Sequence, residues 1–310
     1  MTPKIDPAKF ESYLQNISDE VFIETFMSIV SKDRQEVPFL LNTVQSALAK
    51  SWADWNIVLK YRKPGVSLYT QAKFLSRVLR RRNRNAVVLS FDKTASMEML
   101  DRTHRIVDRL PFKVHMDSES KNEFSIRETN SKFYVGTPGT KAFGRGSDVT
   151  DLHPSEYAFW EDTSIMTGVM EALTRDSFVV VESTANGPSN AFARLYKKGR
   201  DGGSKWKSHF FPWWIDPELE MEPELGFAVT EDEKDLMARY PAITLRKLAW
   251  RRDKMRNMED PELFPQEYPA SENDAFILLS NCVFNHKSLS NYDRIVREPE
   301  RTGYLSLEAM

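Results

Sequence analysis

Short apolar runs alternate along this chain with stretches whose apolar residues recur at helical spacing. The clearest case is an apolar run at residues 57–59, followed by a basic turn with Pro64 and Gly65 and then by helical spacing over residues 68–79. Strand, turn and helix in this order form the frame of a phosphate-binding loop. In such a loop, free backbone N–H groups at a helix N-terminus face the anion, and the helix dipole favours it.

The same two patterns predict the other regular elements. Apolar runs predict strands, and helical spacing over longer stretches predicts helices. Strands are expected at residues 86–91, 124–126, 133–135, 178–181 and 206–214, and helices at residues 18–32, 94–110, around 169–173, from 230 onwards and at 245–257. Strands that alternate with helices are typical of an α/β fold.

Composition removes several classes of function. The net charge of −2 over 310 residues gives no overall nucleic-acid signature, so any DNA binding must rely on local basic patches. The single cysteine, Cys282, excludes a disulfide framework and a cysteine-rich zinc site, and the five histidines form no pair with metal-ligand spacing. The first 32 residues contain no signal-peptide core, and no apolar run is long enough to cross a membrane.

The basic turn carries the first candidate chemistry. Gly65 lets the backbone approach phosphates, and Ser67 offers a hydroxyl to Mg²⁺. Val66 stands where the usual pattern has its lysine, and the first glycine of that pattern is missing. We therefore expect one of three upstream residues to bring a cation to the phosphates: Lys60, Arg62 or Lys63. The alternative is an ordinary basic turn between a strand and a helix.

Two further positions suit nucleotide chemistry. Gln45 lies upstream of the turn, and its amide can donate to and accept from the edge of adenine. A surface glutamine on a helix is the alternative. Arg145 lies between two glycines, which is typical of an exposed loop tip that holds one cation. Residues 182–187 follow a predicted strand with small hydroxyl and amide side chains, where open α/β sheets place functional groups.

Six short motifs follow one another along the chain, at residues 38–45, 59–67, 144–146, 155–160, 182–187 and 266–269. As an ordered set they resemble the large terminase subunit of tailed bacteriophages, and the resemblance covers residues 25–285. It implies a P-loop ATPase of the ASCE type, with a central, mostly parallel sheet flanked by helices and a small helical lid subdomain. It also implies a motor that pumps double-stranded DNA into preformed capsids with ATP and Mg²⁺.

The resemblance implies roles for single residues. Glu156 is expected to polarise the attacking water, and Ser155, where the general ATPase pattern has an aspartate, to help hold Mg²⁺ through water. Arg145 stands in the place of an arginine finger that reaches the neighbouring subunit. The other implied roles are adenine recognition by Gln45, a Mg²⁺ ligand at Ser67, a catalytic cation at Arg62, phosphate binding by Lys60, Arg62, Lys63, Gly65, Val66, Ser67 and Leu68, and coupling to the DNA grip by Ser183, Thr184 and Asn186.

The resemblance also implies a domain plan and partners. Residues 1–215 are expected to form the ATPase core with an N-terminal helical extension, residues 216–280 the lid, and residues 281–310 a linker toward a nuclease domain absent from this chain. The expected partners are double-stranded DNA, the portal protein, the small terminase subunit and further copies of the chain in a ring on the procapsid. This assembly is expected in the host cell cytoplasm, not in the mature virion, and without membrane association.

Two other functions stay open at this point. A helicase-like ATPase that remodels single strands would share the phosphate loop, but it needs a second ATPase-like domain for which 310 residues leave no space. A catalytically silent scaffold that binds DNA or a portal is favoured by the missing lysine at Val66. Glu156 and Arg145 argue against the scaffold, because both are needed only for turnover.

Overall fold

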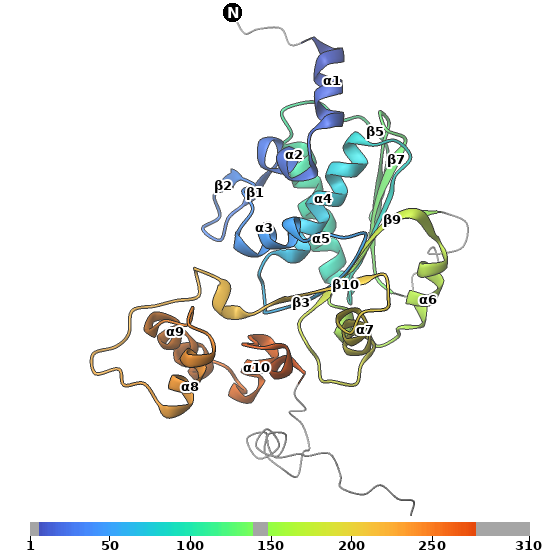
Figure 1. Cartoon of the computed structure of the whole chain (residues 1–310). Helices are drawn as coiled ribbons and strands as arrows, with labels where there is room; N and C mark the ends of the chain where they lie inside the picture. Colours follow the sequence, from blue (N-terminus) through green and yellow to red (C-terminus); the bar gives the residue numbers. More distant parts are fainter. Residues whose placement is uncertain (1–5, 139–147, 277–310) are drawn as a thin grey trace, which may run out of the picture.

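The computed structural model describes residues 6–138 and 148–276. Its centre is an eight-stranded sheet in the order β10-β3-β9-β8-β4-β7-β6-β5 (Figure 1). The strands from β10 to β7 run parallel, and β6 and β5 extend the sheet in antiparallel pairs at one edge. The strand bounds are β3 Trp55–Lys60, β4 Asn85–Leu89, β5 Met116–Glu119, β6 Glu123–Ile126, β7 Ser131–Gly136, β8 Val149–Pro154, β9 Leu173–Ser183 and β10 Trp206–Phe211.

This sheet confirms the predicted α/β fold. Strand β9 lies between β3, which precedes the basic turn, and β8, which ends just before Glu156. One extra strand between these two is the arrangement expected of the ASCE type. The register sets Val58 of β3 beside Glu182 of β9, and an isolated bridge sets Glu182 beside Ser155. The ends of three strands therefore bring their side chains to the same edge of the sheet.

Helices cover both faces of the sheet, because neighbouring residues of a buried strand point to opposite sides (Figure 1). Val58 packs in the core that contains α4 and α5, whereas Ile57 and Leu59 pack in the core that contains α6 and α7. In the described parts of the chain, no helix is long and apolar enough to cross a membrane. The bounds of these helices are α4 Val66–Arg80, α5 Lys93–Asp108, α6 Ser164–Glu171 and α7 Ala191–Arg200.

The N-terminal segment corrects the prediction of one helix over residues 18–32. Its second half forms a hairpin in which β1 (Ser28–Val30) pairs antiparallel with β2 (Glu36–Pro38). Ile29 continues the helical spacing, but its β-branched side chain suits a strand, and Arg34 in the turn has a φ of 60°. The helices of this segment are α1 Pro7–Asn16, α2 Asp19–Phe26 and α3 Thr43–Lys50.

The remaining predicted helices differ little from the structure. The helix expected around residues 169–173 is α6, which ends at Glu171, so that Leu173 already begins β9. The helix expected from residue 230 is capped by Thr230, whose side chain accepts from the Glu233 N–H while the Glu233 side chain accepts from the Thr230 N–H. The helices after the sheet are α8 Glu231–Arg239, α9 Leu245–Arg256, α10 Phe264–Glu267 and α11 Glu272–Ala275.

Helices α8 to α11 form a small unit beside β3 and β10, where the lid was expected (Figure 1). An aromatic cluster joins it to the end of the sheet: the Trp213 ring stacks on Trp250 with centroids 5.3 Å apart and meets Phe264 edge-on at 6.2 Å. The Tyr61 hydroxyl donates to Asp216 at 2.7 Å. The unit is therefore attached next to the basic turn.

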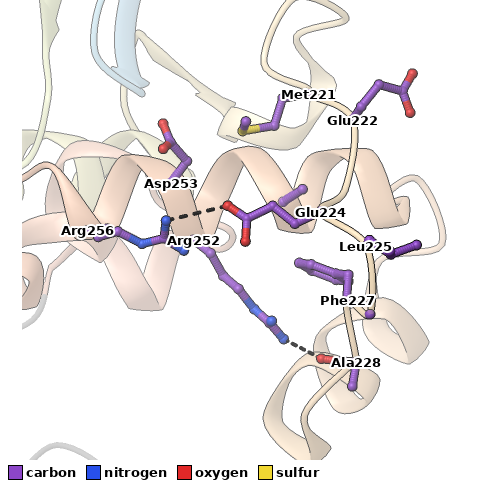
Figure 2. Close-up of a pocket in the computed structure, with 11 residues that line it drawn as sticks. Met221, Glu222, Glu224, Leu225, Phe227, Ala228, Arg252, Asp253 and Arg256 are labelled. Atoms are coloured by element: carbon purple, nitrogen blue, oxygen red, sulfur yellow. Dashed lines mark hydrogen bonds and ion pairs between the residues drawn. The ribbon is translucent and has the colours of Figure 1, made fainter.

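The unit of α8 to α11 and the loop before it contain a hollow of about 340 Å³ (Figure 2). The arginines that line it bind the loop before α8: Arg252 donates to the Ala228 carbonyl at 2.8 Å, and Arg256 lies 3.6 Å from Glu224. Leu225 is fully exposed at its rim. Because these charges hold the loop before α8 against α9, we assign the hollow a structural role.

Candidate active site

The basic turn joins β3 to α4 through two residues in the left-handed region. Lys63 has a φ of 64° and Gly65 a φ of 83°, and α4 begins directly after Gly65. A Cβ at Gly65 would also lie 2.7 Å from the Gln45 Nε2, so another residue would have a strained backbone and would displace the Gln45 amide. The first N–H groups of α4 lie at the end of this turn, where the helix favours an anion.

Gln45 supports the turn from α3. It is buried, its Oε1 accepts from the Asn42 N–H at 3.0 Å, and its Nε2 donates to the Gly65 carbonyl at 2.9 Å. The Asn42 side chain donates to the Pro64 carbonyl at 3.0 Å. The expected adenine contact would require the Gln45 amide to leave these bonds. In this structure Gln45 shapes the loop.

Glu156 adopts a left-handed backbone, with φ 51° and ψ 44°. This backbone conformation is strained and uncommon for residues other than glycine, and residues that adopt it are often found at functional sites. Its Oε2 accepts from the Ser183 hydroxyl and from the Thr184 N–H, both at 3.3 Å, and the side chain is 28% exposed. Contacts from the end of β9 therefore hold this carboxylate while it remains accessible.

The Lys60 ammonium lies between two carboxylates. Its Nζ is 2.8 Å from Glu156 Oε1 and 3.0 Å from Glu182 Oε2, and the side chain is almost completely buried. Burial works against the ammonium, but the facing carboxylates outweigh it and raise the pKa of Lys60 above its ordinary value. Burial likewise favours neutral Glu182, yet the Lys60 charge and the contacts from His153 and Ser155 together outweigh it and lower the pKa of Glu182. Lys60 and Glu182 are therefore both charged at neutral pH.

Glu182 links the phosphate loop to the end of β8, a role that sequence reasoning missed. Its Oε1 accepts from the Ser67 hydroxyl at 2.7 Å and from the Ser155 hydroxyl at 2.6 Å. The His153 Nε2 lies 3.3 Å from the same oxygen. The signal in the sequence was an acid at the end of an apolar strand, directly before the small hydroxyl residues.

A cavity of about 490 Å³ lies between the basic turn and the ends of β8 and β9. Nine residues predicted for the site line it: Lys60, Arg62, Lys63, Gly65, Val66, Ser67, Leu68, Glu156 and Thr184. Phe91, Arg102 and Phe159 line it as well and were not predicted. The structure thus brings the phosphate loop and the expected water-polarising acid to one cavity.

The three candidate cations differ in their surroundings. Arg62 lies toward the lid: its Nη1 is 2.8 Å from Glu267 Oε2, its N–H donates to the Glu267 carbonyl at 2.8 Å, and its side chain is 56% exposed. Lys63 is exposed. Among these three, Lys60 is the one that lies opposite the carboxylates of β8 and β9.

Arg102 adds a cation from α5. It is partly buried, and within the described residues no acid lies within ion-pair distance of it. Burial, and then the neighbouring charge of Arg105, lower the pKa of Arg102. An arginine that has lost part of its hydration and forms no ion pair with the described residues suits an anionic ligand. The sequence pattern of α5 indicated only packing, so this residue was not identified.

Of the expected coupling residues, Ser183 ends β9, and Thr184 and Asn186 lie in the loop that follows it. Ser183 and Thr184 contact Glu156, as described above, and Ser183 Oγ also accepts from the Ala158 N–H at 3.2 Å. Asn186 Nδ2 donates to the Ala158 carbonyl at 3.1 Å. These bonds join the end of β9 and its loop to the loop after β8, so a movement of Glu156 would displace both loops.

No group of three or more metal-ligating side chains occurs in residues 6–138 and 148–276. The Ser67 hydroxyl and the buried Glu182 carboxylate are hard oxygen donors of the kind Mg²⁺ prefers. They fit a cation that arrives together with phosphate oxygens. Arg145, the expected arginine finger, lies outside the described residues.

No protein-family model and no curated protein matches the chain. Solved structures of phage large terminases share its fold. The large terminase of bacteriophage HK97 matches with a TM-score of 0.60 and 15% identity over 81% of this chain and 53% of its own, so this chain spans about half its length. The large terminase ATPase domain of Thermus phage P74-26 matches with a TM-score of 0.53 and 14% identity over 77% of this chain and 95% of its own. The chain therefore has the fold of a phage large-terminase ATPase domain.

Proposed function

We propose that this chain is the ATPase portion of a phage large terminase, which hydrolyses ATP to move double-stranded DNA into a procapsid. The observation that carries the proposal is the meeting of Lys60, Ser67 and Glu156 at one cavity beside the N-terminus of α4. A cation, a hydroxyl and a carboxylate in this arrangement are the groups that phosphoryl transfer to water uses. The shared fold supports the same function.

Phosphate binding would rest on the first N–H groups of α4 and on two cations, Lys60 from β3 and Arg102 from α5. Lys60 is paired with Glu156 in this structure, so the phosphates compete with Glu156 for the ammonium. When Lys60 donates to the phosphates, the Glu156 carboxylate is released. Nucleotide binding would thereby prepare the acid for its own step.

Glu156 then acts as the general base. Its Oε1 accepts a proton from the water that attacks the γ-phosphate, while Ser183 and the Thr184 N–H hold its Oε2. Mg²⁺ bound with ATP supplies positive charge at the phosphate oxygens. Ser67 would offer its hydroxyl to that cation, and Ser155 would act through its hydrogen bond to Glu182.

Full turnover would need a neighbouring subunit. We assign Arg145 the role of an arginine finger in the next subunit's cavity, an interaction worth roughly 10³–10⁵ in rate. The joined loops after β8 and β9 would pass the state of Glu156 to the DNA grip. In this account the chain works as a ring on the procapsid, with the portal protein and the small terminase subunit, in the host cytoplasm and not in the mature virion.

One assay separates this function from the two alternatives. ATP hydrolysis with Mg²⁺ is measured without DNA, with duplex DNA and with single strands. A packaging motor is stimulated by the duplex, and a helicase-like ATPase by single strands. A silent scaffold binds DNA without hydrolysis. The missing lysine at Val66 favoured the scaffold, but the place of Lys60 at the cavity supports turnover.

A further inference from the structure

We propose that Glu182 positions the divalent cation of the bound nucleotide, in place of the acid that Ser155 lacks; this inference rests on the proposed ATPase function. The general pattern places that acid at the end of the strand that here is β8. In this chain the end of β8 carries a hydroxyl, and the carboxylate comes from the adjacent strand, β9. Glu182 is thus a positioning residue that works through Ser67 and Ser155.

The first argument is the set of groups that converge on Glu182. Its Oε1 holds the hydroxyl of Ser67, the loop residue expected beside the cation, at 2.7 Å. Its Oε2 receives no hydrogen bond from the described residues and faces the Lys60 ammonium at 3.0 Å. A fully buried carboxylate with one oxygen on the loop hydroxyl and the other on a cation is set up to balance positive charge at this point.

The second argument is the fit between Ser155 and Glu182. The two residues are bridge partners, both are fully buried, and the Ser155 hydroxyl donates to Glu182 at 2.6 Å. An aspartate at position 155 would set two carboxylates against each other, and one of them would have to take up a proton. The serine therefore avoids a second buried carboxylate beside Glu182 and gives it a hydrogen-bond donor.

The third argument concerns the charge that Glu182 balances. In this structure the balancing charge is Lys60, which Glu182 shares with Glu156. Once Lys60 donates to phosphates, Glu182 keeps its negative charge in a buried place beside Ser67. An uncompensated buried carboxylate is unfavourable, so this state of the site favours a cation close to the Ser67 hydroxyl. The cation and the nucleotide should therefore bind together.

The test is the affinity for ADP, measured by calorimetric titration at increasing Mg²⁺ concentrations. Glu182→Gln keeps the size of the side chain and removes its charge. It should raise the Mg²⁺ concentration that half-maximally strengthens ADP binding by roughly 10–100-fold, the usual cost of losing a group that orients a metal ligand. Binding of ADP without Mg²⁺ should become tighter, because the variant leaves no buried charge without a partner when Lys60 donates to the phosphates. Adding Ser155→Asp to Glu182→Gln returns an acid to the end of β8 and should restore much of the Mg²⁺ dependence.

Two further variants separate positioning from folding. Asp151→Asn removes a different buried acid, which lies in β8 and pairs with Arg77 away from the cavity, and it should lower the melting temperature without changing the Mg²⁺ dependence. Glu182→Asp keeps the charge facing Lys60 but shortens the reach to Ser67, and it should shift the Mg²⁺ dependence even if Glu182→Gln fails to fold. If wild type and Glu182 variants show the same Mg²⁺ dependence, the inference is overturned and the ATPase function stands. A wild-type protein that binds no ADP at any Mg²⁺ concentration overturns both.

Discussion

The Lys60 ammonium and the Glu156 carboxylate form an ion pair of 2.8 Å, although their strands, β3 and β8, are separated by β9. One partner is the cation expected to bind the phosphates, and the other is the acid expected to activate water. Neither group is available for its proposed role while the pair is closed. Nucleotide binding and release of Glu156 are therefore one event in this account.

Lys60 should contribute more to nucleotide affinity than Arg62. Lys60→Met should weaken ATP binding by about 10–100-fold, the effect of losing a charge-assisted contact of about 1.5–3 kcal/mol. Arg62→Ala should have a small effect, because Arg62 is half exposed and paired with Glu267. Equilibrium titration with a fluorescent ATP analogue compares the two. A larger loss in Arg62→Ala would restore Arg62 as the phosphate cation.

Arg102 should strengthen ATP binding, while its partly buried charge lowers the stability of the fold. Arg102→Ala should weaken ATP binding by about tenfold, whereas the exposed Arg105→Ala on the same helix serves as the control and should change it little. Burial disfavours the Arg102 charge and the nearby Glu98 charge offsets this only in part, so removal of the charge should leave the melting temperature unchanged or raise it. Unchanged affinity together with a lower melting temperature would identify Arg102 as a structural residue.

Arg145 should act between subunits. Arg145→Ala should bind ATP normally and hydrolyse almost none, and wild-type activity should rise more than linearly with protein concentration. Mixing Arg145→Ala with Glu156→Gln subunits should restore some activity, since one kind of interface then pairs an intact Glu156 with an intact Arg145. A mixture that assembles but stays inactive would place Arg145 in its own subunit's mechanism.

His209 should make the fold sensitive to acid. Burial, and then the nearby Lys207 charge, lower the pKa of His209 to about 4, and its ring nitrogens lie 2.9 Å from Asn56 Oδ1 and 3.1 Å from the Ser51 hydroxyl. The unfolded chain takes up this proton near the ordinary pKa of about 6.5, before the folded chain does. Stability from this group is thus fully present above about pH 6.5 and lost as the pH falls toward about 4.

The expected loss from His209 is roughly 3 kcal/mol over that pH range. Urea unfolding of wild type and His209→Gln at a series of pH values measures it. The variant should be less stable than wild type at pH 7, with a smaller decrease on acidification. Parallel pH profiles for the two proteins would show that His209 does not titrate in this way.

The parts of the fold that depend on local pattern could be predicted from the sequence. The turn before α4 follows from its glycine and its flanking spacing, and the cap of α8 follows from Thr230 and Glu233. The prediction of residues 18–32 was wrong in its second half, because helical spacing and β-branched side chains indicate different structures there. Residues 28–30 form a strand there because they pair with β2.

The parts of the site that depend on register could not be predicted in this way. Glu182 meets Ser155 only because β9 lies beside β8, a relation that the order of residues does not contain. The direction of Arg62 is likewise set by Glu267, which is 205 positions away. Lys60 was one of three candidates until the sheet placed it opposite two carboxylates.

The most direct test of the account is ATP hydrolysis by the Glu156→Gln variant. The substitution keeps the shape of the side chain and removes the base, so turnover should fall by roughly a hundredfold or more while ATP binding stays nearly intact. Glu161→Gln is the matched control, because Glu161 lies nearby on the surface, and it should hydrolyse ATP like wild type. Unchanged turnover in Glu156→Gln would contradict the mechanism, and loss of turnover in Glu161→Gln instead would move the catalytic base to that residue.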